Sequence, residues 1–338
     1  MSDPGLGKVL VTGGGGFLGS ALVAFARGRG LWVRSLSRQH YPQLEKLGVE
    51  QIRGDISDAA VVDRAVEGCQ TVFHTAAKAG LWGPEREYER VNVEGTRNVI
   101  DACRRKGTRR IIFTSSPSVV FNGRAMEGAD ESAPYPGRFD ASYPRTKALA
   151  EQLVVASNSK DLAAVSIRPH LIWGPGDNNL LPRIISRARS GRLRRIGDGE
   201  PMIDPIYIDN AATAHFLAAD RLEPGSPIAG KIYFVTQGEL IPLWTMIDRL
   251  LAAAGMAPVR RSIKRPVAIA TAGLLELGYF LSSQSAEPPL TRFLVRQLST
   301  THWFKIDAAR RDLGYEPAIS IDQGMQLLRE HLQSAAAA

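Results

Sequence analysis

The chain has 338 residues, of which 44% are hydrophobic and 22% are charged. This composition is typical of a folded globular protein and excludes a disordered or fibrous one. The net charge of +8 suits anionic ligands, such as a phosphorylated cofactor or a carboxylate. Lys and Arg are scattered without interleaved aromatic residues, so we expect no nucleic-acid partner. Two cysteines and no evident signal peptide predict a cytoplasmic protein without disulfides.

The first half of the chain alternates short apolar strands with helical patterns. Strands that alternate with helices indicate right-handed βαβ units and a parallel, doubly wound sheet. The predicted fold class is therefore α/β. Strands are predicted at residues 8–12, 31–36, 49–53, 71–74, 109–115 and 163–168, and helices at 16–27, 59–67, 88–106 and 143–159.

Beyond residue 170 the pattern changes to loops rich in Gly and Pro, followed by mostly helical segments. We expect residues 1–170, with 205–236 returning to them, to form the main domain. Residues 171–204 and 237–338 would form a smaller, mostly helical substrate lobe at the carboxyl edge of the sheet. Segment 267–281 is apolar but shorter than the roughly 20 residues of a membrane span. It predicts a buried helix or, alternatively, a helix that makes a peripheral membrane contact or lines an apolar substrate entrance.

A glycine-rich turn, Gly13 to Gly19, lies between the first predicted strand and the first helix. Gly13, Gly16 and Gly19 would allow a tight turn and a close approach of the backbone to a pyrophosphate. Phe17 and Leu18 open the helix, whose free N–H groups suit an anion. The turn predicts a Rossmann fold that binds a nicotinamide dinucleotide.

The second strand ends in Ser37 and Arg38, with no acidic residue to bind a ribose 2′-hydroxyl. A 2′-phosphate is favoured instead, so we predict NADP(H), with NAD(H) as the alternative. Arg34 is a further candidate for the phosphate, although alternation along the strand would point its side chain elsewhere. The ends of the third and fourth strands supply the other predicted cofactor contacts, which are Asp55, Ile56, Ala76, Ala77 and Lys78.

The catalytic signal is Tyr143 with Lys147, four residues apart on one helical face. A nearby ammonium would lower the pKa of the phenol, so that Tyr143 could exchange a proton with a substrate oxygen. Lys147 could also hydrogen-bond the nicotinamide ribose, and we predict that Tyr143 and Lys147 both contact the cofactor. Ser116, at the end of the preceding strand, would polarise the carbonyl, and Ser115 is the alternative. The six histidines are isolated, and no metal site is predicted.

Together these residues resemble the extended short-chain dehydrogenase/reductase superfamily, and within it the 3β-hydroxysteroid dehydrogenase-like branch. Residues 114–119 (TSSPSV), 168–177 (RPHLIWGPGD) and 207–211 (YIDNA) carry the resemblance to that branch. It implies that Asn92 and Pro169 also lie at the cofactor. It disfavours the sugar-nucleotide epimerases, because Ile203 stands before Asp204 where those enzymes usually carry an Arg for the diphosphate.

The resemblance implies one of two activities. One is NADPH-dependent reduction of a 2-alkyl-3-oxoalkanoic acid to the 3-hydroxy acid in long-chain olefin biosynthesis, which residues 76–83 and 289–295 favour. The other is decarboxylating oxidation of a 4α-carboxysterol at C3. A non-catalytic NADP-binding sensor is the alternative of another class, and the intact Ser116, Tyr143 and Lys147 disfavour it.

Both activities require a hydrophobic carboxylic acid as substrate, and the carboxylate needs a cation. Lys78, Arg183 and Arg292 are the candidates. His170 is either a structural histidine or a substrate contact. We also expect a homodimer or an association with other enzymes of the pathway.

Overall fold

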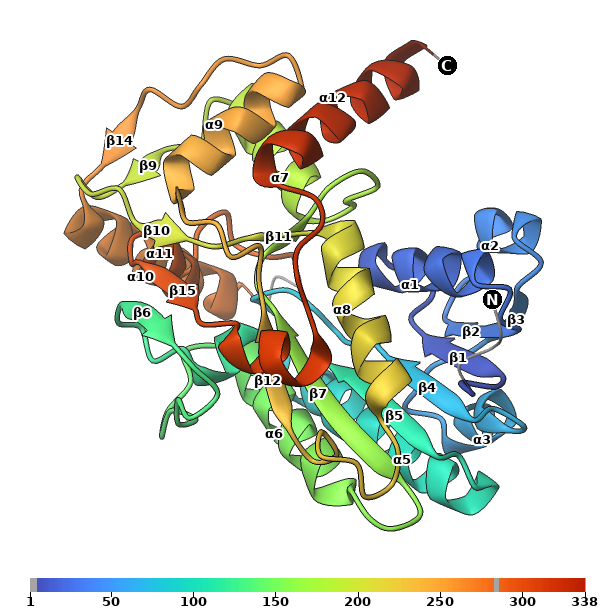
Figure 1. The fold of residues 1–338 in the computed structure, drawn as a ribbon. Helices are drawn as coiled ribbons and strands as arrows, with labels where there is room; N and C mark the ends of the chain where they lie inside the picture. The colour runs from blue at the N-terminus through green and yellow to red at the C-terminus, as the bar shows by residue number, and fades with distance from the viewer. Residues whose placement is uncertain (1–4, 283–285, 338) are drawn as a thin grey trace.

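The computed structural model describes residues 5–282 and 286–337. Its centre is a seven-stranded sheet of order β12-β7-β5-β4-β1-β2-β3, in which every pair of neighbours is parallel (Figure 1). This confirms the predicted doubly wound α/β fold. The strands are β1 (Val9–Thr12), β2 (Val33–Ser37), β3 (Glu50–Arg53), β4 (Thr71–His74), β5 (Arg110–Thr114), β7 (Ala163–Pro169) and β12 (Ile232–Val235).

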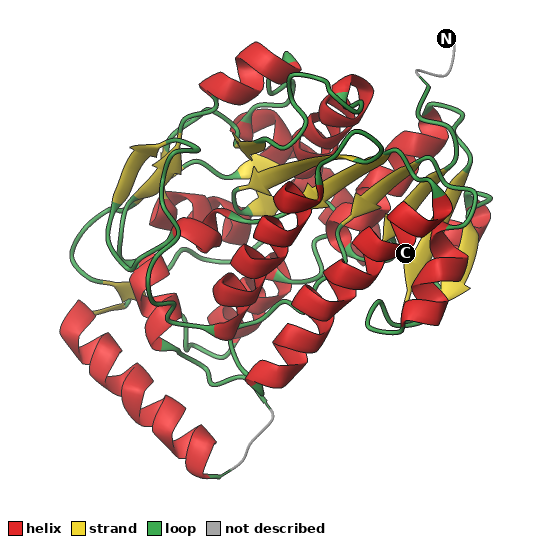
Figure 2. Cartoon of the chain, turned by 90° about the horizontal axis from the view of Figure 1, so that it is seen from below, coloured by secondary structure: helices red, strands yellow, loops and turns green. Residues whose placement is uncertain are grey.

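Helices cover both faces of this sheet (Figure 2). On one face α1 (Phe17–Gly28) packs against α8 (Ile208–Arg221), and their apolar residues join the larger core. On the other face α5 (Gly95–Lys106) packs between α3 (Ala59–Val66) and α6 (Ser142–Ser157) around a second core. The two layers hold the carboxyl ends of all the central strands at one edge.

The helix predicted at 88–106 is not one regular helix. It consists of α4 (Glu85–Tyr88), a π-helical turn η1 (Glu89–Glu94) and α5. The wider turn contains Asn92, whose side chain is buried. Single π-helical turns within helices are frequent at functional sites.

A second sheet, of order β13-β10-β15-β6, was not predicted. Its strands are β13 (Ile241–Pro242), β10 (Met202–Ile203), β15 (His302–Phe304) and β6 (Met126–Ala129). β6 comes from the first half of the chain, yet it pairs with β15 near the end. The proposed domain division stays a prediction. Its ranges include residues 1–4, 283–285 and 338, which lie outside the described residues.

Short elements complete the chain. The two-stranded pairs are β8 (Ile172–Trp173) with β11 (Ile206–Tyr207), and β9 (Arg195–Ile196) with β14 (Ser262–Ile263). The remaining helices are α2 (Pro42–Lys46), η2 (Pro117–Val120), α7 (Leu180–Arg189), α9 (Leu243–Ala253), α10 (Arg265–Leu281), α11 (Arg292–Leu298), η3 (Ala309–Leu313) and α12 (Ile321–Ala337).

The expectation of a buried helix over 267–281 is wrong. Helix α10 lies at the edge of the molecule (Figure 2), and of its residues just Ala268 and Ala272 are buried. A search of the described residues finds no helix with the length and apolar character of a membrane span. The apolar side chains of α10 that face solvent are Val267, Leu274, Leu277, Phe280 and Leu281.

Candidate active site

A cavity of about 1090 Å³ opens at the carboxyl edge of the central sheet. Its wall contains nearly all of the residues predicted to form the site. Two predicted residues, Asn92 and Lys147, lie behind the wall rather than in it. The predicted residues in the wall are Gly13, Gly16, Phe17, Leu18, Gly19, Ser37, Arg38, Asp55, Ile56, Ala76, Ala77, Lys78, Ser116, Tyr143 and Pro169.

The glycine turn forms one end of the cavity. Gly13 has a φ of +74°, and a Cβ on Gly19 would come within 2.1 Å of the Gly13 carbonyl oxygen. Gly16 caps α1 without a side-chain hydrogen bond, and the first turn of α1 carries no acidic residue. The free N–H groups and positive end of α1 therefore face the cavity, which is the environment a pyrophosphate requires.

Beyond the turn, Ser37 accepts a hydrogen bond from the Gly15 N–H at 3.3 Å, and Arg38 follows it in the wall. Asp55 accepts hydrogen bonds from the backbone and hydroxyl of Ser57, both at 2.9 Å. Burial alone would raise the pKa of Asp55, but these bonds and Arg90 hold it below its usual value. The wall thus offers a cationic and an anionic side chain near the end of β2.

Arg34 does not contribute to this site. Its guanidinium donates to the carbonyls of Ala65 and Glu67 and pairs with Glu50 at 3.0 Å. Side chains alternate along a strand, so Arg34 and Ser37 leave β2 on opposite faces. The candidate role of Arg34 in phosphate binding is therefore wrong.

The Asn92 side chain is hydrogen-bonded to the backbone of the loop that follows β4. Its side-chain oxygen accepts from the Lys78 N–H at 2.7 Å, and its amide donates to the Lys78 carbonyl and to Thr146. Three hydrogen bonds thus tie the π-helical turn to the loop and to α6. Asn92 shapes the cavity wall without lying in it.

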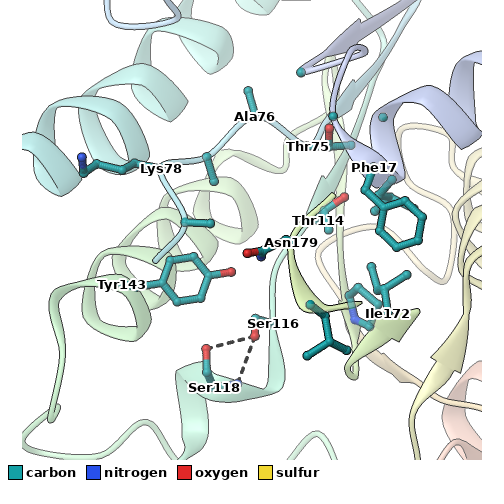
Figure 3. Close-up of a pocket in the computed structure, with 18 of the residues that line it drawn as sticks. Phe17, Thr75, Ala76, Lys78, Thr114, Ser116, Ser118, Tyr143, Ile172 and Asn179 are labelled. Carbon is teal, nitrogen blue, oxygen red and sulfur yellow. Dashed lines mark hydrogen bonds between the residues drawn. The ribbon is translucent and has the colours of Figure 1, made fainter. Parts of the chain in front are cut away.

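The phenol of Tyr143 points toward Ser116 across the cavity (Figure 3). Ser116 itself accepts hydrogen bonds from the backbone and the hydroxyl of Ser118, at 3.2 and 2.9 Å. Burial raises the pKa of Tyr143, and the Ser116 hydroxyl partly opposes that shift. This net direction is the opposite of the one expected from Lys147. Ser115, the alternative to Ser116, is buried, and its hydroxyl has no hydrogen-bond partner among the described residues.

Lys147 lies one helical turn behind Tyr143 and is buried. Its ammonium donates to the Thr114 carbonyl at 2.5 Å and sits 4.0 Å from the centre of the Phe113 ring. Burial lowers the pKa of Lys147 to about 7, while Glu151 acts in the opposite direction. Near neutrality Lys147 therefore exchanges readily between its charged and neutral forms.

Glu151, one turn further along α6, is a residue whose role the sequence did not reveal. It is fully buried and pairs with the buried Arg168 at 2.6 Å. Ser166 and Tyr135 also donate to its carboxylate, at 2.7 and 2.8 Å. The spacing of residues 143, 147 and 151 along one helical face is visible in the sequence. The sequence does not show that Glu151 is buried, because its partner Arg168 comes from a strand that only the fold brings next to α6.

The far end of the cavity is apolar and aromatic, with two histidines in its wall. Of the three candidate cations for a carboxylate, Arg292 is not in the wall and pairs with Glu276. Lys78 and Arg183 are in the wall, where they pair with Glu87 and Glu287. The apolar residues at this end are Phe121, Leu171, Ile172, Leu180, Leu243, Phe293, Leu294, Leu298 and Phe304.

No group of three or more His, Cys, Asp or Glu side chains suited to a metal ion is found among residues 5–282 and 286–337. Cys69 and Cys103 are both free thiols, and burial raises the pKa of Cys69 to about 11 and that of Cys103 to about 12. Neither cysteine lies in the cavity wall.

Comparisons with known proteins point in one direction. The model of the 3-beta hydroxysteroid dehydrogenase/isomerase family matches residues 10–265. A 2-alkyl-3-oxoalkanoate reductase from Stenotrophomonas maltophilia is 50% identical over 325 residues, covering 95% of this chain and 98% of that protein. A protein of the same name from Shewanella oneidensis is 41% identical over 330 residues, covering 95% and 85% of the two chains.

Solved structures support the fold. The UDP-glucose 4-epimerase of Thermus thermophilus, in complex with NAD, matches with a TM-score of 0.73 at 24% identity, over 97% of this chain and 99% of that one. At this identity the likeness concerns the fold alone. The family match, in contrast, spans most of the chain. The chain therefore belongs to the 3-beta hydroxysteroid dehydrogenase/isomerase family, a branch of the extended short-chain dehydrogenases that act as NAD(P)-dependent oxidoreductases.

Proposed function

We propose that the protein reduces a 2-alkyl-3-oxoalkanoic acid to the corresponding 2-alkyl-3-hydroxy acid, with NADPH as the reductant. One observation carries the proposal. Tyr143 and Ser116 face each other in the wall of a cavity that has the glycine turn at one end and a large apolar surface at the other. The names of the two relatives reported above supply the substrate class.

The chain's own residues would act on the oxygen at C3. Bound NADPH supplies a hydride to the carbonyl carbon. The Ser116 hydroxyl hydrogen-bonds the carbonyl oxygen and holds it beside Tyr143. Tyr143 then donates its phenolic proton to that oxygen as negative charge develops there. Its raised pKa keeps it protonated at neutral pH, which suits a proton donor in the reducing direction.

Lys147 would support Tyr143 from behind the wall. In its charged form it stabilises the phenolate that remains after proton transfer. Its hydrogen bond to the Thr114 carbonyl fixes the ammonium directly below the strand end that carries Ser116. Glu151 keeps a negative charge on the same helical face and so favours the charged form of Lys147.

The preference for NADPH rests on Ser37 and Arg38. A hydroxyl and a guanidinium at the end of β2 match a 2′-phosphate, whereas a bare 2′-hydroxyl would require an acceptor there. The glycine turn and the N-terminus of α1 would hold the pyrophosphate, and the small Ala76 and Ala77 would allow the cofactor to lie close to the loop.

The test is turnover with purified protein. NADPH oxidation is followed by its near-ultraviolet absorbance with a synthetic 2-alkyl-3-oxo acid, and the hydroxy acid product is identified by mass spectrometry. A parallel assay offers a 4α-carboxysterol with NAD⁺ or NADP⁺. Reduction of the acyl substrate supports the proposal. Oxidation of the sterol alone would contradict it and would assign the same catalytic residues to sterol chemistry.

A further inference from the structure

Two histidines, His170 and His302, lie in the wall of the apolar end of the cavity, and both are buried. Their rings meet edge to face, with centres 5.0 Å apart. They differ in their partners. His170 Nδ1 lies 2.7 Å from an Asp204 carboxylate oxygen, whereas His302 Nε2 lies 2.8 Å from the neutral side-chain oxygen of Gln297.

The two rings therefore lie in different electrostatic surroundings. A buried charge requires an opposite charge or several hydrogen bonds nearby. Asp204 gives His170 that opposite charge, and its second oxygen is fixed by the Phe304 N–H at 2.9 Å. Burial lowers the pKa of His302 to about 3, with His170 adding to the shift, so His302 stays neutral. Among the described residues, His170 is thus the buried cavity histidine with a carboxylate partner.

The strand register places His170 near Ser116 at the carboxyl edge of the sheet. Ser116 comes two residues after Thr114 in β5, and His170 comes three residues after Ile167 in β7; Thr114 and Ile167 are register partners. At this register Ser116 is level with Pro169, and His170 lies one residue beyond it. Neighbouring parallel strands lie about 5 Å apart, and both side chains lie in the cavity wall beyond the carboxyl ends of β5 and β7. In a 3-oxo acid a single carbon separates the carbonyl from the carboxylate, so a group that binds the latter must lie near Ser116.

Lys78 and Arg183, the two other candidate cations in the wall, suit this task less well. The Lys78 amine points away from Tyr143 in Figure 3 and lies 2.7 Å from Glu87. Arg183 pairs with Glu287, and its side chain is 44% exposed, where water weakens an ionic contact. The His170 side chain, at 8% exposed, would meet a carboxylate away from bulk water.

We propose that His170, held by Asp204, forms the subsite that binds the substrate carboxylate, an inference that rests on the proposed function. Nδ1–H donates to Asp204, and Nε2–H of the charged ring donates to a carboxylate oxygen. Loss of carbon dioxide would break the C1–C2 bond and move its electron pair to C2. A cationic donor on the carboxylate holds electron density on its oxygens and opposes that step, so the acid survives to be reduced.

The experiment compares a stable acid with its neutral analogue. The 2-alkyl-3-hydroxy acid and its methyl ester are oxidised with NADP⁺ by the wild type, by His170→Gln and by the control His331→Gln, whose exposed side chain on α12 lies outside the cavity wall. Glutamine retains a donor to Asp204 but carries no charge. For His170→Gln we expect KM for the acid to rise about ten-fold or more, with kcat nearly kept and the ester unaffected. The control should change neither substrate more than about two-fold.

Asp204 is a positioning residue in this proposal, so Asp204→Asn should raise KM for the acid and leave the ester unchanged. Equal losses for acid and ester in His170→Gln would overturn the proposal, because they would indicate a general structural role. An unchanged KM would overturn it as well. NADP⁺ binding by each variant shows that it has folded.

Binding of a saturated 2-alkyl alkanoate to the enzyme with NADP⁺ separates the two proposals, since this acid has no oxygen at C3. It is measured by calorimetry with the wild type and His170→Gln. If no hydroxy acid is turned over but the alkanoate binds in a His170-dependent manner, the carboxylate subsite stands and the proposed reaction fails. If the hydroxy acid is turned over but the alkanoate binds equally well to the wild type and to His170→Gln, the proposed reaction stands and the carboxylate subsite fails.

Discussion

The two ends of the cavity are built in different ways. The cofactor end comes from contiguous strand-turn-helix segments, in which Gly13 to Gly19 join β1 to α1 and Ser37 and Arg38 end β2. The substrate end is assembled from segments far apart in the sequence, including Phe121, His170 and residues 293–304. The first end depends on backbone geometry that local sequence dictates. The second depends on side chains that meet only after folding.

This contrast predicts how amino-acid substitutions affect the two ends. At the glycine turn few residues can replace glycine, because an added Cβ would clash with the backbone. An apolar wall accepts other side chains of similar volume at a modest loss of stability. We therefore expect the largest losses from substitutions at the catalytic pair and the turn, and graded effects elsewhere.

The largest effect is expected for Tyr143→Phe, which removes the proton donor at the junction of the two ends. Positioned acid catalysis contributes roughly 10²- to 10⁴-fold, so kcat should fall by about 10³-fold. NADPH binding, measured by fluorescence, should be retained because the phenol lies apart from the glycine turn. A variant with near wild-type turnover would exclude Tyr143 as the proton donor.

Next comes Gly19→Ala, which tests the cofactor end alone. The added Cβ would lie 2.1 Å from the Gly13 carbonyl oxygen, so the turn must shift. We expect the Kd for NADPH to rise by about 100-fold, since the free N–H groups of α1 lose their alignment. The matched control is Gly28→Ala at the other end of α1, where a Cβ meets nothing within 4 Å. Equal affinities of the two variants would refute the assigned role of the turn.

Arg38→Ala should separate the two nicotinamide cofactors. A hydrogen bond to a charged group contributes about 1.5–3 kcal/mol, which corresponds to a weakening of roughly ten-fold or more. That loss is expected for NADPH and not for NADH, which lacks the 2′-phosphate. Parallel titrations with the two cofactors measure it. A similar loss for both would mean that Arg38 does not contact the phosphate.

The pKa of Lys147 predicts a pH-dependent stability. Because burial lowers it from 10.5 to about 7, the unfolded chain binds more protons than the folded one between these values. The contribution of this group to the free energy of unfolding therefore rises with pH across that window, by about 1.4 kcal/mol per pH unit at most. Denaturant unfolding without cofactor, at pH 7 and pH 9, compares the wild type with Lys147→Met. The Met variant should lack this gain, and an equal gain in both proteins would contradict the assignment.

The smallest effect on fold and activity is expected for Phe280→Ser on α10. Phe280 is 75% exposed, and surface substitutions usually change stability by less than about 0.5 kcal/mol. If this face contacts a membrane surface, sedimentation with vesicles of anionic lipid should decrease while turnover of a soluble substrate is kept. A marked loss of stability would instead mean that Phe280 is packed in solution.

Hydrophobic patterns and turn residues in the sequence were sufficient to predict the parallel central sheet. The apolar runs that became β4 and β7 are bounded by polar or proline residues and could be placed to within a residue. The second sheet could not be foreseen, because strands as short as Met202–Ile203 carry no periodic signal and pair with residues about a hundred positions away. The prediction for α10 was wrong for a related reason. Its apolar residues suggested a buried helix, but whether a helix is buried depends on distant segments, and here they leave one face of α10 exposed.

For the site, sequence by itself determined the glycine turn, the end of β2, and Tyr143 with Lys147 and Ser116, because each depends on local spacing along a strand or helix. Tertiary structure alone decided that Glu151 meets Arg168, that Arg34 pairs with Glu50, and that His170 meets Asp204 rather than a neutral partner. Burial and charge pairing depend on which distant segments the fold brings together, and they set the charge state of a side chain.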